Sequence, residues 1–169
     1  DAFVITYVGR HNEVKGYDNL KLIGEELFKL DNNIYILCAG KEEPLRGLHN
    51  KRWIEVGWTN DPYSIINAGD VFLLPNKETY FDIIFLEVFS LGKFIIASNT
   101  GGNKYFKKFH TNYIKLYDSN SEAVKMLIKI KSQHFKEDLV KNDLIKIFEN
   151  NFNEETFARN YLSLINKLK

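Results

Sequence analysis

Cysteine, methionine and proline are scarce in this chain, whose 169 residues include one cysteine, one methionine and three prolines. A single cysteine cannot form an internal disulfide, which excludes the disulfide-rich class of small secreted domains. Cys38 stands inside the apolar run of residues 34–39, so we expect it to be a buried thiol in a strand. This cysteine usage fits a reducing compartment, and we expect a cytoplasmic protein.

Long apolar runs and an excess of one charge are also missing. No run approaches the roughly 20 residues of a membrane-spanning helix, and the sequence has no signal-peptide pattern. Lys+Arg total 23 and Asp+Glu total 22, for a formal net charge of +1. This balance argues against a large nucleic-acid footprint, so we expect no nucleic-acid partner. The chain opens at Asp1 rather than Met, and we expect it to be a piece of a longer protein.

Metal-binding and nucleotide-binding motifs are lacking as well. The four histidines are scattered, and none pairs with Cys, Asp or Glu at metal-ligand spacing. There is no nucleophile elbow, no Walker loop and no GxGxxG after a strand. We therefore expect no metal site and no bound cofactor. The histidines are His11, His49, His110 and His134.

Short apolar runs alternate with segments of helical periodicity along most of the chain. This alternation predicts an α/β fold with one Rossmann-like domain over residues 1–169. We expect a mostly parallel six-stranded sheet with helices on both faces and further helices appended at the C-terminus. The predicted strands are residues 3–8, 34–39, 53–56, 70–74, 94–97 and 113–116. The predicted helices are residues 17–30, a segment starting near 62, residues 82–91, residues 104–109 and three tail segments.

Ligands of such sheets bind at the carboxyl ends of the strands. The first loop there carries Arg10 and Lys15, and a guanidinium with an ammonium suits a diphosphate. Each charge-assisted contact would contribute roughly 1.5–3 kcal/mol. The alternative is a pair of solvated loop cations. The five loops at this edge are residues 9–16, 40–51, 57–61, 75–82 and 98–103.

Residues 75–92, PNKETYFDIIFLEVFSLG, hold a carboxylate in a segment that is otherwise apolar. Glu87 must find a partner or face a cleft there, because burying it unpaired is costly. A structural pair with a lysine or a backbone N–H is the alternative. Asp82 is expected to cap the helix, with an oxygen on the N–H groups two or three residues later. The N–H groups of Ile83 and Ile84 would meet a phosphate or sugar oxygen.

One glycine pair, one Gly-Trp dipeptide and one basic cluster are less specific. Gly101-Gly102 permits close backbone approach to a ligand, or simply a tight turn. At Gly57-Trp58 the indole would cover a base or pack between loops. The cluster of residues 104–110, KYFKKFH, is either a solvated face or a membrane-surface contact in which Tyr105, Phe106 and Phe109 dip into an interface.

Together these segments resemble a known family. YVGR with the following KG, then GWTNDP, DVFLLPN, FDIIFLEVFSLGK and ASNTGGN, stand in one order over residues 3–106. The order and spacing resemble the C-terminal, donor-binding domain of GT-B-fold retaining glycosyltransferases, in the large group 1 family of glycosyl transferases. Each motif alone is weak, and five in order are specific.

The resemblance implies roles for particular residues. Arg10 and Lys15 match the basic pair that binds the donor diphosphate and stabilises the leaving group. Glu87 matches the carboxylate that binds the donor ribose. The other donor-binding residues implied are Gly9, Gly57, Thr79, Phe81, Asp82, Ile83, Ile84, Gly101 and Gly102. Such enzymes transfer a sugar from a UDP- or GDP-linked donor with retention, need no metal at the diphosphate, and carry the acceptor site on an N-terminal domain.

The chain departs from the family pattern in one turn. The first carboxylate of the paired motif belongs eight residues before Glu87, where this chain has Thr79, and Glu78 is one position out of register. Asp82 replaces the usual glycine. These changes mark either a different donor or a weakened sugar contact.

Three functions stay open at this point. The first is the donor-binding half of a glycosyltransferase for bacterial surface polysaccharide or glycolipid, peripheral at the inner face of the membrane. The second is half of a nucleotide-sugar epimerase. The third is a non-catalytic α/β binding module. The fragment alone is expected to bind a nucleotide-sugar weakly and not to turn it over.

Overall fold

The computed structural model describes residues 2–133 and 135–168, and in these residues six strands form one sheet. The strands are β1 (Phe3–Val8), β2 (Ile34–Ala39), β3 (Trp53–Gly57), β4 (Val71–Leu74), β5 (Phe94–Ser98) and β6 (Ile114–Tyr117). Their order is β3-β2-β1-β4-β5-β6, and every neighbouring pair is parallel. The predicted Rossmann-like sheet is confirmed, with each strand within one residue of its predicted bounds.

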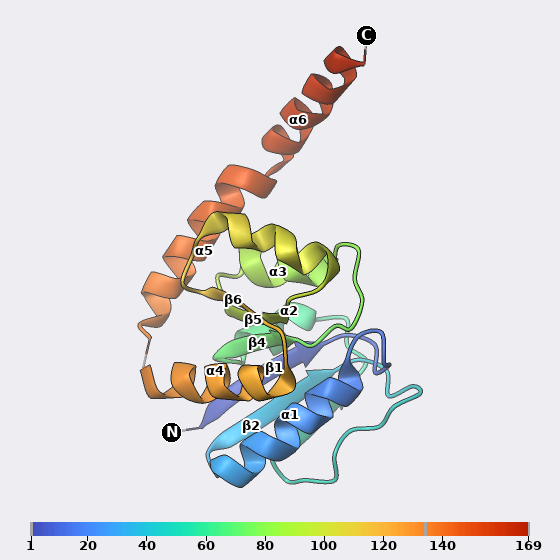
Figure 1. Cartoon of the computed structure of the whole chain (residues 1–169), viewed down its shortest axis with the longest axis vertical. Helices are drawn as coiled ribbons and strands as arrows, with labels where there is room; N and C mark the ends of the chain where they lie inside the picture. Colours follow the sequence, from blue (N-terminus) through green and yellow to red (C-terminus); the bar gives the residue numbers. More distant parts are fainter. Residues whose placement is uncertain (1, 134, 169) are drawn as a thin grey trace.

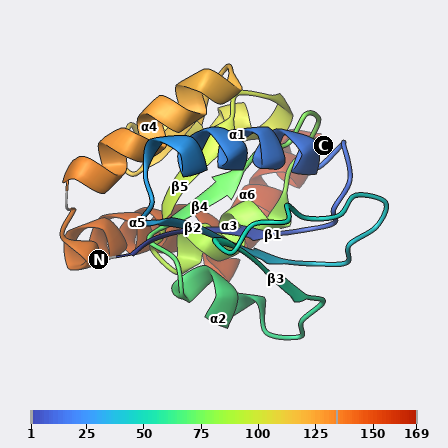
Figure 2. The same cartoon turned by 90° about the horizontal axis from the view of Figure 1, so that it is seen from below.

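Helices cover both faces of the sheet, as predicted. Helices α1 (Tyr17–Leu30) and α4 (Asn120–Gln133) lie together on one face, and α2 (Pro62–Asn67), α3 (Ile83–Ser90) and α5 (Glu137–Phe152) lie on the other (Figures 1 and 2). The 3₁₀ helix η1 (Gly101–Phe109) begins three residues earlier than predicted. Helix α6 (Glu154–Lys167) extends away from the body of the molecule (Figure 1).

The strands are buried because helices cover both faces of a parallel sheet. All four residues of β4 are buried, as are the first four of β5. Cys38 is fully buried in β2, as predicted, and this burial raises the pKa of its thiol.

An aromatic cluster attaches η1 to the helices around it. The Phe106 ring stacks on Phe85 of α3 with centroids 3.6 Å apart, and it lies 6.1 Å from Phe152 of α5. Phe106 is buried in this cluster, so the hypothesis that its ring dips into a membrane interface is wrong. Tyr105 stays exposed, and the Lys108 ammonium lies 3.8 Å from its ring centroid.

Candidate functional site

The loops after β1 and β4 lie side by side at the carboxyl edge of the sheet. The N–H of Lys77 donates to the Val14 carbonyl at 3.1 Å, and the N–H of Glu78 donates to the same oxygen at 3.4 Å. Gly16 has φ 68°, and a Cβ there would lie 1.7 Å from the Pro75 carbonyl oxygen. Only glycine allows this approach, so Gly16 brings the loop of Arg10 and Lys15 against the loop that follows β4.

The loop after β5 closes on the same segment. The Thr100 hydroxyl donates to the Lys77 carbonyl at 3.1 Å, and the N–H of Gly102 donates to the Thr79 carbonyl at 3.1 Å. A Cβ on Gly101 would lie 1.7 Å from that Thr79 oxygen, and one on Gly102 would lie 1.9 Å from the Tyr80 oxygen. The close approach of these glycines is therefore to the chain's own backbone, and their contact with a donor stays a prediction.

Lys15 and Asp82 form an ion pair across the two loops. The Lys15 Nζ lies 2.5 Å from the Asp82 Oδ2, and the Asn76 amide donates to the same oxygen at 2.7 Å. Asp82 stands at the N-cap position of α3, but its side chain makes no capping hydrogen bond. The expected capping bond is wrong, because the carboxylate bonds the Lys15 ammonium and the Asn76 amide instead. The first N–H groups of α3, which have no partner within the helix, are left for another acceptor.

Arg10 lies in the same loop as Lys15 and is exposed. The Tyr7 hydroxyl donates to the Arg10 carbonyl at 2.8 Å, which fixes the backbone of the loop where it leaves β1. Gly9 lies between them, and a Cβ there would be 2.9 Å from the Tyr7 oxygen. Gly57 ends β3 at the same edge with φ 79°, and no atom lies within 4 Å of its built Cβ. The open space at Gly57 is consistent with ligand access, and its role stays a prediction.

Glu87 is half-buried on α3, just over one turn from the helix start. No hydrogen bond or ion pair holds its carboxylate within the part of the chain that the structure describes. A structural pair with a lysine or a backbone N–H, the alternative for this residue, is absent there. Two apolar neighbours of Asp82 are also open to solvent, since Phe81 is exposed and Ile83 is 69% exposed, while Ile84 is half-buried.

A buried polar cluster beneath the first loop was not predicted. The Tyr17 hydroxyl and the Trp53 indole N–H both donate to Glu55 Oε1, and His11 stacks on Tyr17 with centroids 3.9 Å apart. His11 is fully buried, and neither ring nitrogen has a hydrogen-bond partner among the described residues. Its Nε2 lies 3.9 Å from Glu55 Oε2. Trp53 and Glu55 share a face of β3 by the alternation of a strand, but nothing in the sequence places His11 beside them.

Burial lowers the pKa of His11 below its ordinary value of 6.5, and the nearby Glu55 carboxylate partly opposes this shift. The unfolded chain therefore takes up a proton near pH 6.5 that the folded chain resists, so the unfolded state binds more protons below that pH. We expect the free energy of unfolding to fall as pH drops below 6.5, by at most about 1.4 kcal/mol per pH unit for this one group. Urea denaturation in steps from pH 7.5 to about pH 5.5 measures it.

The variant His11→Gln removes the titrating group and should flatten this dependence relative to the unchanged chain. The control variant is the same substitution at an exposed histidine, His49→Gln. Equal slopes in the unchanged chain and the His11 variant would show that His11 titrates alike in both states.

Other features of the structure add no candidate site. Within residues 2–133 and 135–168, no three His, Cys, Asp or Glu side chains are grouped closely enough to hold a metal ion. No described helix is long and apolar enough to cross a membrane. His134 lies outside the described residues.

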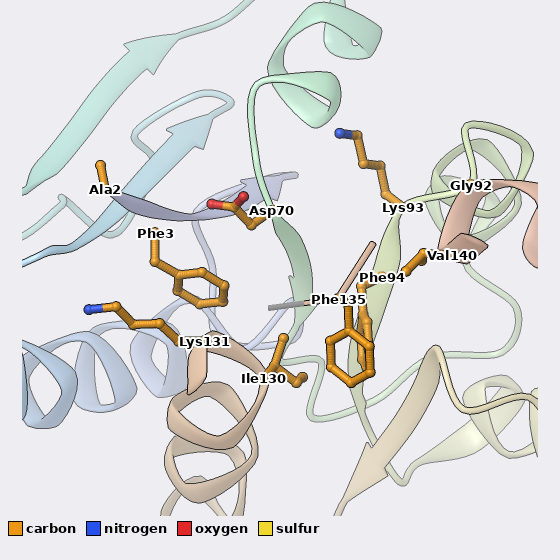
Figure 3. Close-up of a pocket in the computed structure, with 10 residues that line it drawn as sticks. All are labelled: Ala2, Phe3, Asp70, Gly92, Lys93, Phe94, Ile130, Lys131, Phe135 and Val140. Atoms are coloured by element: carbon orange, nitrogen blue, oxygen red, sulfur yellow. The ribbon is translucent and has the colours of Figure 1, made fainter. Parts of the chain in front are cut away.

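A cavity of about 310 Å³ opens at the opposite edge of the sheet. Figure 3 shows Phe3, Asp70 and Phe94 around it, at the amino ends of β1, β4 and β5. The Asp70 carboxylate there accepts a hydrogen bond from the Val4 N–H at 2.7 Å, which joins the two strand starts. The cavity is therefore far along the strands from the Arg10 and Lys15 loop, and it is not the candidate site.

Comparison with known proteins identifies a matching protein family and several solved structures that share this fold. A family described as "Glycosyl transferases group 1" matches residues 2–130. The UDP-Gal:alpha-D-GlcNAc-diphosphoundecaprenol alpha-1,3-galactosyltransferase of Escherichia coli is 34% identical over 168 residues, covering 90% of this chain and 42% of that protein. This chain therefore spans less than half of its curated relative.

Solved structures share the fold at low identity. HepE of Anabaena, in complex with UDP and glucose, superposes with a TM-score of 0.77 at 14% identity, over 98% of this chain and 48% of that one. The lipopolysaccharide outer core galactosyltransferase WaaB, in its apo form, superposes with a TM-score of 0.75 at 16% identity, over 100% of this chain and 50% of that one. Sucrose-phosphate synthase of Thermosynechococcus elongatus superposes with a TM-score of 0.76 at 19% identity, over 99% of this chain and 46% of that one. In each comparison this chain covers about half of the longer solved chain.

Proposed function

Because this chain belongs to the glycosyl transferases group 1 family, we propose that it is the donor-binding half of a retaining, metal-independent glycosyltransferase. The observation that carries the proposal is the contact between the Lys15 loop and the start of α3. The Lys15 Nζ lies 2.5 Å from the Oδ2 of Asp82, the N-cap residue of this helix. A cation, a helix N-terminus and the half-buried Glu87 then belong to adjoining segments at the carboxyl edge. That edge is where a parallel sheet binds its ligand.

The chemistry assigned to these residues is stabilisation of a leaving group. Breaking the bond between sugar and nucleoside diphosphate leaves negative charge on the diphosphate. Arg10 and Lys15 supply positive charge to it, and the free N–H groups at the start of α3 supply hydrogen bonds. Such preorganised electrostatics stabilise the transition state more than the ground state, which is what accelerates the reaction.

The donor is proposed to be a UDP- or GDP-linked sugar. The curated relative is named for UDP-Gal, and one of the solved folds was crystallised with UDP and glucose. The relative's name also carries diphosphoundecaprenol, a lipid. We place the full-length protein accordingly in the synthesis of a bacterial surface polysaccharide or glycolipid, cytoplasmic and peripheral at the inner face of the membrane.

The acceptor site is proposed to lie on a domain outside the 169 residues. The support is that this chain spans 42% of the Escherichia coli relative and about half of the solved structures. Helix α6 adds support, because none of its described residues is buried, and on it Phe157 is 72% exposed and Leu164 57%. An apolar stripe so open would be covered by another part of the protein.

Calorimetric titration of the 169-residue chain with UDP, GDP and their sugars tests the donor site. Weak binding without turnover is the expected result, and no binding at millimolar ligand would contradict a donor site. With the full-length protein, sugar transfer without epimerisation of the free nucleotide-sugar excludes the epimerase alternative.

Glu87→Ala is expected to weaken nucleoside diphosphate binding by about tenfold or more, because a hydrogen bond to a charged group contributes about 1.5–3 kcal/mol. The measurement compares the affinity for UDP with that for its 2′,3′-dideoxy analogue. The unchanged chain should prefer UDP, and the variant should lose this preference.

The matched control is Glu26→Ala, which removes an exposed glutamate of α1. That variant should keep the preference for UDP over the dideoxy analogue. If the Glu87 variant also keeps it, Glu87 does not bind the ribose.

A further inference from the structure

The two oxygens of the Asp82 carboxylate have different surroundings. Oδ2 accepts from the Lys15 ammonium at 2.5 Å and from the Asn76 amide at 2.7 Å. Oδ1 has no hydrogen-bond partner among the described residues, and it is not one of the unpaired oxygens closed off from solvent. The side chain as a whole is 11% exposed. One oxygen therefore joins the loops of Lys15 and Asn76, and the other is available to a ligand.

The carboxylate is fixed from the buried side of the loop. Asn76 is 2% exposed, and its carbonyl accepts a hydrogen bond from the Ser98 hydroxyl at 2.6 Å. Asn76 is thus buried and held through its backbone, its side-chain amide anchors Asp82, and Asp82 in turn holds the ammonium of Lys15. The position of Oδ1 is therefore set before any ligand arrives, which is the condition for selective binding.

The pair of charges defines the ligand chemistry. An ionised carboxylate only accepts hydrogen bonds, and an ammonium only donates them. A phosphate fits the ammonium but not Oδ1, whereas a hydroxyl fits Oδ1. A ligand that satisfies both carries an acceptor oxygen and an O–H group close together, as the phosphate and the sugar hydroxyls of a glycosyl diphosphate do.

We propose that Asp82 binds the sugar part of the donor, its Oδ1 accepting a hydrogen bond from a sugar hydroxyl while its Oδ2 keeps Lys15 in place for the diphosphate. This inference rests on the proposed function, and it names the residue that selects the sugar. It also accounts for Thr79, which stands where the family resemblance places a carboxylate. The Thr79 backbone is held against Gly101 and Gly102, and the carboxylate of this turn stands at Asp82 instead.

The test compares affinities of the full-length protein for UDP and UDP-galactose, and for GDP and GDP-mannose, by calorimetry. We expect Asp82→Asn to reduce the gain in affinity that the sugar gives by about tenfold. Binding of the bare diphosphate should stay within about threefold or tighten, because the single oxygen of the asparagine can still accept from Lys15 while a negative charge near the phosphates is removed. Asp82→Glu keeps the charge but shifts the oxygen, so it should also lose the sugar's contribution.

Glu78→Gln is the matched control, since it removes a charge from an exposed side chain of the same turn and should change neither affinity. Equal changes for UDP and UDP-galactose in the Asp82 variants, or tighter UDP binding with the sugar's contribution intact, would overturn the inference and leave Asp82 as a counter-ion of Lys15. If the unchanged protein binds none of the four nucleotides, the proposed function itself fails. Thermal unfolding of each variant establishes that it is folded, and Asp82→Glu serves if Asp82→Asn is not.

Discussion

Lys15→Ala is expected to lower kcat/KM of the full-length protein for its nucleotide-sugar by about 10²- to 10³-fold, the usual cost of removing one preorganised group from the charge that develops in a transition state. Two effects add in this variant. The leaving diphosphate loses a cation, and the Asp82 carboxylate, 2.5 Å from the ammonium, is left unpaired beside the phosphates. Steady-state kinetics of sugar transfer measure the change.

A double-mutant cycle separates these two effects. If the unpaired carboxylate contributes to the loss, Asp82→Asn should restore part of the nucleotide affinity that Lys15→Ala removes, so the two changes will not be additive. Additive losses would show that the ion pair has no part in the effect of Lys15.

Lys77→Ala is the control for general electrostatics. Lys77 lies on the neighbouring loop and pairs with the Asp18 carboxylate, so the variant removes the same charge and breaks a comparable ion pair. Its kcat/KM should stay within about threefold, because exposed pairs of this kind contribute about 0–1 kcal/mol. A large loss in this variant would mean that the net charge of the edge, rather than the position of Lys15, matters.

The fold could be predicted from the sequence because its signal is local. Six short apolar runs, each ended by glycine, proline or a polar turn, indicate buried strands, and all six strands lie within one residue of the prediction. The start of η1 was missed, because its first two residues are Gly101 and Gly102, and glycine is a poor helix former. The hypothesis of a membrane contact at Phe106 failed for a related reason. Its burial depends on α5, whose Phe152 lies 46 positions further along the chain.

The candidate site could be predicted only to the level of its loops. The rule that ligands bind at carboxyl ends of parallel strands placed Arg10, Lys15, Asp82 and Glu87 at one edge. It could not predict that Lys15 pairs with Asp82, since these residues are 67 positions apart and a capping bond was the simpler local expectation. Likewise the burial of His11 beside Glu55 depends on tertiary packing alone.

Phe106→Ala is expected to lower the free energy of unfolding by about 3–5 kcal/mol, the range for removing a buried phenylalanine. Its ring is 2% exposed, stacks on Phe85 at 3.6 Å and lies 6.0 Å from Phe89 and 6.1 Å from Phe152, so no single neighbour can fill the space that it leaves. Urea denaturation of the 169-residue chain measures the change.

The same substitution at an exposed ring is the control for Phe106. Phe157→Ala on α6 should change the free energy of unfolding by no more than about 0.5 kcal/mol, because its ring is 72% exposed. A loss at Phe106 near 1 kcal/mol would show that α3, η1 and α5 repack around the cavity. A loss of about 3–5 kcal/mol in the free energy of unfolding would mean that the aromatic cluster holds α3, and with it Asp82 and Glu87, in one position. Donor affinity of Phe106→Ala under conditions where it remains folded should then fall too, since the α3 N-terminus would no longer be fixed against the Lys15 loop.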